Sequence, residues 1–189
     1  MLKDLHRAAD RAHRTLDRRL PGHDLDAVKS PLIRALHDYW AGKRQGQLLP
    51  RKSEIDPTDL KPMLPYMLLA DFTTEPFRVR YRLVGTEVVS IYGMDFTGRW
   101  LDELDFGDQI EGGWPLWYRT VFQIGRPVFG AARLRAVSGV EMDYEFALFP
   151  LSDNAGGPTH CLDLNDYRPH LRRIAESWTQ LQLRQRAGH

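Results

Sequence analysis

The sequence of 189 residues predicts an α+β fold. Short runs in which apolar and polar residues alternate are typical of strands, and longer runs with apolar residues three or four apart are typical of helices. Glycine or proline separates the two kinds of run at most boundaries. With 42% hydrophobic and 27% charged residues, the chain is ordinary globular material and long enough for one core with flanking helices.

The stretch 78–103, RVRYRLVGTEVVSIYGMDFTGRWLDE, changes its period at Gly85. Before Gly85 apolar residues take every second position, which predicts a strand. The positions between them are all basic: Arg78, Arg80 and Arg82. After Gly85 the apolar residues follow helical spacing until Gly93, a typical helix stop. The stretch therefore predicts a strand followed by a short helix.

Four segments precede this stretch. Residues 1–20 carry leucine and alanine at near-helical spacing among six Lys or Arg, and we expect a solvated basic helix there rather than a membrane-surface segment. A second helix begins at Ser30-Pro31 and runs to Gly42. Asp56-Pro57 repeats this start signal and predicts a short helix to about Leu64. The apolar run 66–72 is too short for a helix and predicts a buried strand.

Five segments follow it. A helix is expected over 114–124, with two tryptophans on one face, and a strand opens at Pro127. This strand and the next one flank Ser138-Gly139. A fifth strand covers 160–165, and a last helix begins at about Pro169.

Charge sorting predicts the register of the two strands around Gly139. A two-residue loop would place arginines beside Met142 and Tyr144 on the apolar face. A loop of three residues, 138–140, instead separates the charged pairs from the apolar pairs, and we therefore expect the longer loop. The expected pairs are Arg135 with Asp143, Arg133 with Glu145, Leu134 with Tyr144 and Ala132 with Phe146.

Two stretches resemble the PAS sensory domain, specifically the stand-alone bacterial type found mostly in alphaproteobacteria. They are YRLVGTEVVSIYGMDFTGR at 81–99 and LPRKSEIDPTDLKPMLPYMLLADF at 49–72, and the resemblance covers about residues 45–170. It implies a five-stranded antiparallel sheet with helices on one face, plus N-terminal and C-terminal flanking helices. The domains expected are an N-terminal helical extension at 1–44, a PAS-like domain at 45–167 and a C-terminal helix at 168–189.

No catalytic or metal-binding motif is expected, because the sequence contains no GxxxxGK, GxSxG, HExxH, CxxC or GxGxxG pattern. None of the seven histidines lies between residues 38 and 159, where haem-binding members of the family carry their axial ligand. The only cysteine, Cys161, lies in a late strand rather than on the helix that carries the reactive cysteine of flavin photoreceptors. The resemblance therefore implies neither haem nor a covalent flavin, and leaves an unknown small molecule as the remaining kind of ligand.

Two candidate sites remain. The three arginines of the strand before Gly85 form either an anion-binding or partner-binding face or a solvated face paired with nearby acids. If the space between sheet and helices holds a ligand, aromatic side chains are expected to line it, since ligand sites combine apolar walls with a few polar tips. These are Tyr81, Trp114, Trp117, Tyr118, Tyr144 and Phe146. If these rings fill the space themselves, the domain is expected to bind proteins instead.

The expected partners are a second copy of the chain and an unknown signalling protein. The apolar stripes at 32–40 and 171–181 need a surface to cover, either on the sheet or on a second subunit. The dimer contacts proposed on these stripes are Leu36, Trp40, Ile174 and Trp178. A net charge of +1 argues against nucleic acid as the main partner, although 168–189 is basic. No apolar run is long enough to span a membrane, and we expect a cytoplasmic protein.

The function predicted is a non-enzymatic PAS sensory or adaptor module in bacterial signal transduction, acting through protein contacts and gated by a small molecule if one binds. The alternative is a small cone-fold enzyme or a binding protein for a hydrophobic ligand, of the kind that pairs a buried tyrosine with an aspartate of raised pKa. Asp163 and Asp143 are the candidate acids for that alternative.

Overall fold

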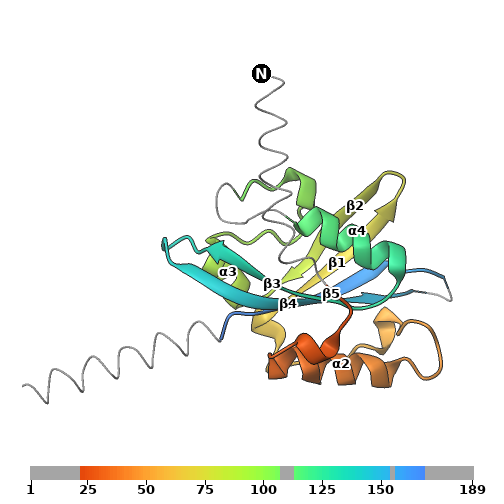
Figure 1. Ribbon diagram of the computed structural model, residues 1–189. Coiled ribbons are helices and arrows are strands. Elements are labelled where there is room, and N and C mark those ends of the chain that lie inside the picture. Colours follow the sequence, from red (N-terminus) through yellow and green to blue (C-terminus); the bar gives the residue numbers. More distant parts are fainter. Residues whose placement is uncertain (1–21, 107–112, 154–155, 169–189) are drawn as a thin grey trace, which may run out of the picture.

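The structure is a computed structural model that describes residues 22–106, 113–153 and 156–168. Five strands form one antiparallel sheet in the order β2-β1-β5-β4-β3 (Figure 1). The strands are β1 (Met67–Thr74), β2 (Phe77–Val84), β3 (Val128–Arg135), β4 (Glu141–Leu151) and β5 (His160–Asp166). The α-helices are α2 (Pro31–Lys43), α3 (Thr86–Tyr92) and α4 (Trp114–Ile124); short 3-10 helices are η1 (Leu25–Ala27), η2 (Lys52–Glu54), η3 (Leu64–Tyr66) and η4 (Leu101–Glu103).

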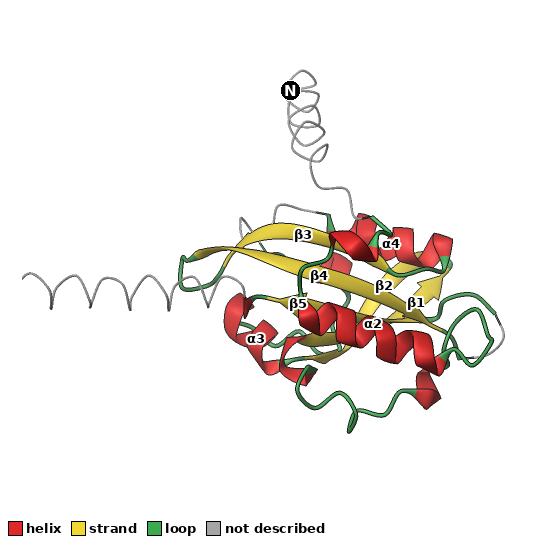
Figure 2. Cartoon of the chain, turned by 60° about the horizontal axis from the view of Figure 1, so that its bottom comes forward, coloured by secondary structure: helices red, strands yellow, loops and turns green. Residues whose placement is uncertain are grey.

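The sheet has a helical layer on each face. Helices α3 and α4, which lie between β2 and β3 in the sequence, pack on one face, and α2 packs on the other (Figures 1 and 2). Each interface is a separate hydrophobic core: an aromatic core under α3 and α4, and an aliphatic and aromatic core under α2. The central strands are therefore covered on both sides, and every residue of β5 is buried.

Helix α2 covers the face of the sheet opposite α3 and α4. Leu36 is fully buried, and Trp40 is 4% exposed and donates a hydrogen bond of 2.8 Å from Nε1 to the carbonyl oxygen of Pro150. The apolar stripe that needed a surface therefore packs on the sheet of its own chain. Leu36 and Trp40 are not available as contacts with a second copy in this arrangement. The matching residues of the second stripe, Ile174 and Trp178, lie outside the described residues.

The junction between β2 and α3 requires glycine at position 85 because the backbone of η3 approaches it closely. A Cβ atom there would lie 2.3 Å from the carbonyl oxygen of Pro65 and 2.4 Å from that of Leu64. The Gly85 N–H also donates to the carbonyl oxygen of Met67 at 2.8 Å, which ties the junction to β1. The change of period seen in the sequence is thus a real boundary between strand and helix.

The register of β3 and β4 differs from the predicted one by two residues. The structure pairs Arg133 with Asp143 and Arg135 with Glu141, so the predicted pairing of Arg135 with Asp143 is wrong. The loop does have three residues, but they are 137–139, and the Ala136 N–H donates to the carbonyl oxygen of Val140. Gly139 takes a φ of 83°, and a glycine in this left-handed region closes a three-residue hairpin loop. A shift of two residues keeps every side chain on its predicted face.

The helix predicted from Asp56 to Leu64 does not form. Residues 57–63 are successive turns and lead into the short helix η3. Asp56 does act as a local cap, since its Oδ1 accepts a hydrogen bond of 2.8 Å from the Thr58 N–H. In an α-helix the N–H of residue 62 would donate to the carbonyl oxygen of Thr58, and that of residue 65 to the carbonyl oxygen of Lys61. Both positions are proline and have no N–H, which explains why the start signal leads to no regular helix.

The other strands and α-helices that are described lie within two or three residues of their predicted positions, and the short helices η1 and η2 were not predicted. The helices predicted at 1–20 and from Pro169 onward fall outside the described residues. Among the residues that are described, no helix is both long and apolar enough to cross a membrane. The division of the chain at residues 44 and 167 stays a prediction, although α2 shares a core with the sheet.

Candidate functional site

Strand β5 carries two polar side chains into the aromatic core. Cys161 lies in the aromatic core, and Asp163 and Asn165 line a cavity on that same side of the sheet. Leu162 and Leu164 face the core under α2. Alternation along the strand produces this arrangement, and the central position of β5 leaves neither set of side chains in contact with solvent.

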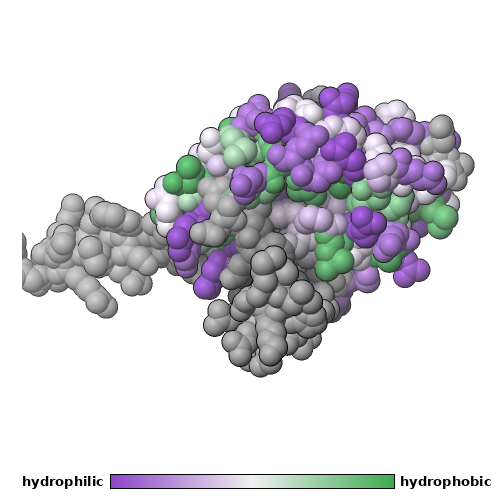
Figure 3. Space-filling view, turned by 90° about the horizontal axis from the view of Figure 1, so that it is seen from above, coloured by the Kyte–Doolittle hydropathy of each residue, from purple (hydrophilic) through white to green (hydrophobic). Residues whose placement is uncertain are grey.

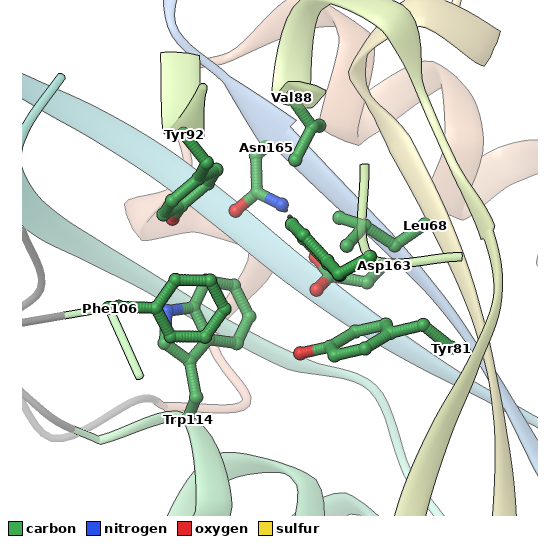
Figure 4. Close-up of a pocket in the computed structure, with 9 residues that line it drawn as sticks. Leu68, Tyr81, Val88, Tyr92, Phe106, Trp114, Asp163 and Asn165 are labelled. Atoms are coloured by element: carbon green, nitrogen blue, oxygen red, sulfur yellow. Dashed lines mark hydrogen bonds between the residues drawn. The ribbon is translucent and has the colours of Figure 1, made fainter. Parts of the chain in front are cut away.

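Asp163 is fully buried and is held by two neutral side chains. The Tyr118 hydroxyl, from α4, donates a hydrogen bond of 2.9 Å to Oδ2, and the Asn165 amide donates one of 3.2 Å to Oδ1. Figure 4 shows Asp163 and Asn165 projecting from β5 toward the rings of Tyr81 and Trp114. No arginine, lysine or histidine is among the described residues that contact this carboxyl group.

Burial raises the pKa of Asp163 well above its usual value, and the hydrogen bonds from Tyr118 and Asn165 offset only part of that rise. The pKa of Tyr118 is also raised, first by burial and then by the nearby Asp163. Both shifts favour the uncharged forms of the two groups. A protonated carboxyl group can donate one hydrogen bond and accept others, so this site suits an uncharged hydrogen-bonding neighbour better than a cation.

Aromatic rings close the space around Asp163. Tyr81 packs edge-on against Phe96, with ring centroids 4.8 Å apart, and against Tyr118 at 6.1 Å. Trp117 stacks on Phe146 at 4.1 Å. The cavity that remains has a volume of about 10 Å³, close to the lower limit of ~10–15 Å³ for a single water molecule. In this structure the rings fill most of the interior.

Several polar atoms around the cavity make no hydrogen bond within the described part of the chain. Trp114 Nε1 and Asn165 Oδ1 both belong to residues that line the cavity. The hydroxyls of Tyr144 and Tyr167, whose rings are 5.1 Å apart, are two others. A buried donor or acceptor without a partner costs about 1–3 kcal/mol. The site is therefore suited to a small molecule that satisfies one donor and one acceptor, and one water fits the volume.

The six aromatic residues predicted to line a ligand space are all buried in the aromatic core. Only Tyr81 and Trp114 of the six line the cavity, together with Asp163 and Asn165. The other four, Trp117, Tyr118, Tyr144 and Phe146, pack behind them. A ligand role for any of the six stays a prediction.

Sequence reasoning missed Asn165 and considered Asp163 only as an acid for the alternative enzyme function. The run HCLDLND alternates apolar and polar residues, which is the pattern of a strand with one solvated face. The signal that reveals its burial is not local: β5 lies between β1 and β4, and both faces of the sheet are covered there. A carboxylate at such a position is rare unless it has a partner.

The three predicted arginines of β2 are each engaged with a neighbour. Arg78 makes hydrogen bonds of 2.8 Å with Asp102 and of 2.9 Å with Glu103. Arg80 donates to the carbonyl oxygen of Gly98 at 3.1 Å, and Arg82 lies 3.3 Å from Asp71. This is the paired, solvated face that was the second interpretation of the pattern. An anion or partner role for the face stays a prediction.

The remaining candidate groups are placed as follows. Asp143 lies on the outer side of β4, is partly exposed and pairs with Arg133 at 2.9 Å. It therefore does not share the buried environment of the tyrosines. Cys161 is buried on β5, where burial raises the pKa of its thiol. Within the described ranges, no group of three or more His, Cys, Asp and Glu residues is arranged to hold a metal ion.

The five-stranded antiparallel sheet, with the helices between β2 and β3 over one face and a buried polar group under them, defines an α+β domain of the PAS class. A family model described as a PAS domain matches residues 28–164, and the chain belongs to that family. PAS domains are in general non-enzymatic sensory modules.

No curated protein matches the chain. A solved structure titled "Structure of an RNA-binding Light-Oxygen-Voltage Receptor" is similar, with 22% sequence identity, 75% of this chain and 42% of that chain covered, and a TM-score of 0.43. The chain thus spans less than half the length of that protein.

Proposed function

We propose that the protein is a non-enzymatic PAS sensory and adaptor module that acts through protein contacts in the cytoplasm of a bacterium. The observation that carries this proposal is the filled interior. The aromatic rings leave a cavity of about 10 Å³, which is far below the ≈ 300–1,000 Å³ of a site for an ordinary organic ligand. Input by protein contact needs no such space.

The surface that we propose for such contacts is the tip of the β3-β4 hairpin, beside α3 (Figure 1). Val137, Val140 and Met94, which we call the hairpin patch, are 61%, 41% and 37% exposed. The tip is held against α3 because the Val137 N–H donates to the carbonyl oxygen of Ile91 at 2.9 Å. Exposed apolar groups that lie together on a fixed backbone favour an interaction surface.

Proximity labelling in the native cell tests this proposal. We expect a ligase fused to the intact chain to label a reproducible set of proteins, and the variant carrying Val137→Ser and Val140→Ser to lose that set. Leu116→Ser is the matched control, since Leu116 is 47% exposed on α4, away from the patch. The proposal is rejected if no protein is labelled above ligase alone, or if the double variant labels the same set while its thermal unfolding is unchanged.

One observation favours the alternative of a small enzyme or a binding protein for a hydrophobic ligand. Asp163, with its raised pKa, accepts a hydrogen bond from the buried Tyr118, which is the pair that alternative requires. Native mass spectrometry of the chain purified from its own cells distinguishes the two. Our proposal predicts no ligand in the interior, and a stoichiometric organic adduct that Asp163→Asn abolishes would favour the alternative.

A further inference from the structure

An open groove lies on the side of the sheet that α2 covers, between the second half of α2 and the edge strand β3. Its volume is about 890 Å³, within the ≈ 300–1,000 Å³ typical of small-molecule sites. Its walls include apolar side chains from η1, α2, the loop after α2, α4 and β3: Leu25, Trp40, Leu49, Ile124 and Phe129. Trp40 is fixed there by its hydrogen bond to Pro150, so one wall is rigid.

The rim of the groove is basic. Arg44, Arg126, His23 and His37 line it, and none of the described residues that line it is Asp or Glu. This bias does not follow from the composition of the folded part. Of the 26 Lys and Arg and the 25 Asp and Glu in the chain, ten and six lie outside the described residues, which leaves 16 basic against 19 acidic groups. The groove is a basic concavity on an acidic body.

Both guanidinium groups have N–H donors without a partner among the described residues. Arg44 donates through Nε to the carbonyl oxygen of Gln47 at 3.1 Å and lies over the Trp40 ring at 5.6 Å, so its two terminal nitrogens have no partner in the described part of the chain. Arg126 is exposed and makes no hydrogen bond or ion pair with any described residue. An arginine fork with free N–H groups matches the geometry of a carboxylate.

We propose that this groove binds a small amphipathic organic anion, such as a medium-chain carboxylate. The apolar body lies against the exposed Ile124 and Leu48 side chains and the small exposed parts of Trp40 and Phe129, and the carboxylate accepts hydrogen bonds from Arg44 and Arg126. Apolar walls supply affinity through burial, and the two cations select the charged head group. The groove is on the opposite face of the sheet from the Asp163 cavity, so this ligand acts on α2 and is independent of the proposed protein contacts.

Calorimetric titration of the full chain with octanoate and with 1-octanol tests the proposal. We expect octanoate to bind at least tenfold more tightly than octanol, because only the acid engages the arginines. The variant Arg44→Gln plus Arg126→Gln should lose at least tenfold in octanoate affinity. Arg99→Gln is the matched control: Arg99 is exposed beside β2, remote from the groove, and its loss should leave binding unchanged.

A nuclear magnetic resonance titration locates the ligand. The Trp40 indole N–H signal should shift with octanoate in the intact chain and in Arg99→Gln. Far-UV circular dichroism shows whether the double variant is folded. Equal affinity for octanoate and octanol, unchanged binding in the folded double variant, or no shift of the Trp40 signal at millimolar octanoate would each overturn the proposal.

Discussion

The Ser30 side chain joins the start of α2 to the end of β5. Its Oγ accepts a hydrogen bond of 3.1 Å from the Ile33 N–H, which caps the helix, and donates one of 2.5 Å to Oδ2 of Asp166. Asp166 also accepts two hydrogen bonds of 2.8 Å from the Arg168 guanidinium. One hydroxyl thus connects α2, the central strand and the beginning of the C-terminal segment.

Replacement of Ser30 should show how much this connection contributes. We expect Ser30→Ala to lower the free energy of unfolding by about 1–2 kcal/mol, because it removes a helix cap and leaves the buried Asp166 with one fewer donor. Urea unfolding measures the change. Thr58→Ala is the control, since the Thr58 side chain is exposed and the substitution keeps the backbone N–H that donates to Oδ1 of Asp56. Equal losses in the two variants would contradict a special role for Ser30.

The close approach at Gly85 predicts opposite outcomes for two glycine substitutions. Gly85→Ala should destabilise the fold by about 1–3 kcal/mol, because its Cβ would meet two backbone carbonyl oxygens that cannot move aside. Gly42→Ala should be neutral or stabilise by up to about 1 kcal/mol, since Gly42 is an exposed helical residue and an added Cβ atom would have no described atom outside the helix within 4 Å. Thermal unfolding of the two variants compares them, and a stable Gly85→Ala protein would show that the junction is looser than the structure has it.

The raised pKa of Asp163 predicts a stability that depends on pH. The folded state keeps the proton of Asp163 at pH values where the unfolded chain, with a pKa of about 3.9, has lost it. Folding therefore takes up a proton, and this group makes the protein less stable as pH rises above about 4, by at most about 1.4 kcal/mol per unit. Asp163→Asn removes this contribution. The free energy of unfolding of the variant, relative to that of the wild type, should therefore increase from pH 5 to pH 8. Urea unfolding at each pH measures these free energies. If those of the two proteins changed equally with pH, the result would argue against a buried, protonated carboxyl group.

The position of Trp40 under α2 predicts a loss of stability rather than of association. We expect Trp40→Ala to cost about 3–5 kcal/mol, since it empties a buried site and removes the hydrogen bond to Pro150. Trp100→Ala should cost much less, because Trp100 is only partly buried and stacks on Arg78 at 4.1 Å. Sedimentation of both variants tests the homodimer, which stays a prediction. A folded Trp40→Ala monomer derived from a wild-type dimer would restore Trp40 as a direct contact.

The sequence was sufficient for the elements whose signals are local. The period change at Gly85, the Ser30-Pro31 start and the glycines after α3 and α4 each act on neighbouring backbone, and the structure has a boundary at each. The start signal at Asp56 is equally local, yet Pro62 prevents the helix from continuing. A start signal alone does not predict the length of an element.

The features that could not be predicted depend on which surfaces meet. Charge sorting determined which side chains share a face of β3 and β4, but the same sorting is satisfied by registers two residues apart. The choice depends on which residue closes the turn, and Gly139 does so with a positive φ. Likewise, nothing within α2 shows that its stripe meets the sheet rather than a second subunit. The burial of Asp163 could not be predicted for the same reason, since it depends on helices that are distant in the sequence.

The last strand in the sequence is the one at the centre of the sheet. β1 and β2 form one hairpin and β3 and β4 another, and β5 alone is bonded to both. During synthesis the two hairpins therefore leave the ribosome before the strand that joins them, and each exposes an unpaired inner edge until residue 166 has emerged. Completion of the sheet is thus a late step that requires nearly the whole described chain, and a nascent chain stopped before His160 would be prone to aggregate.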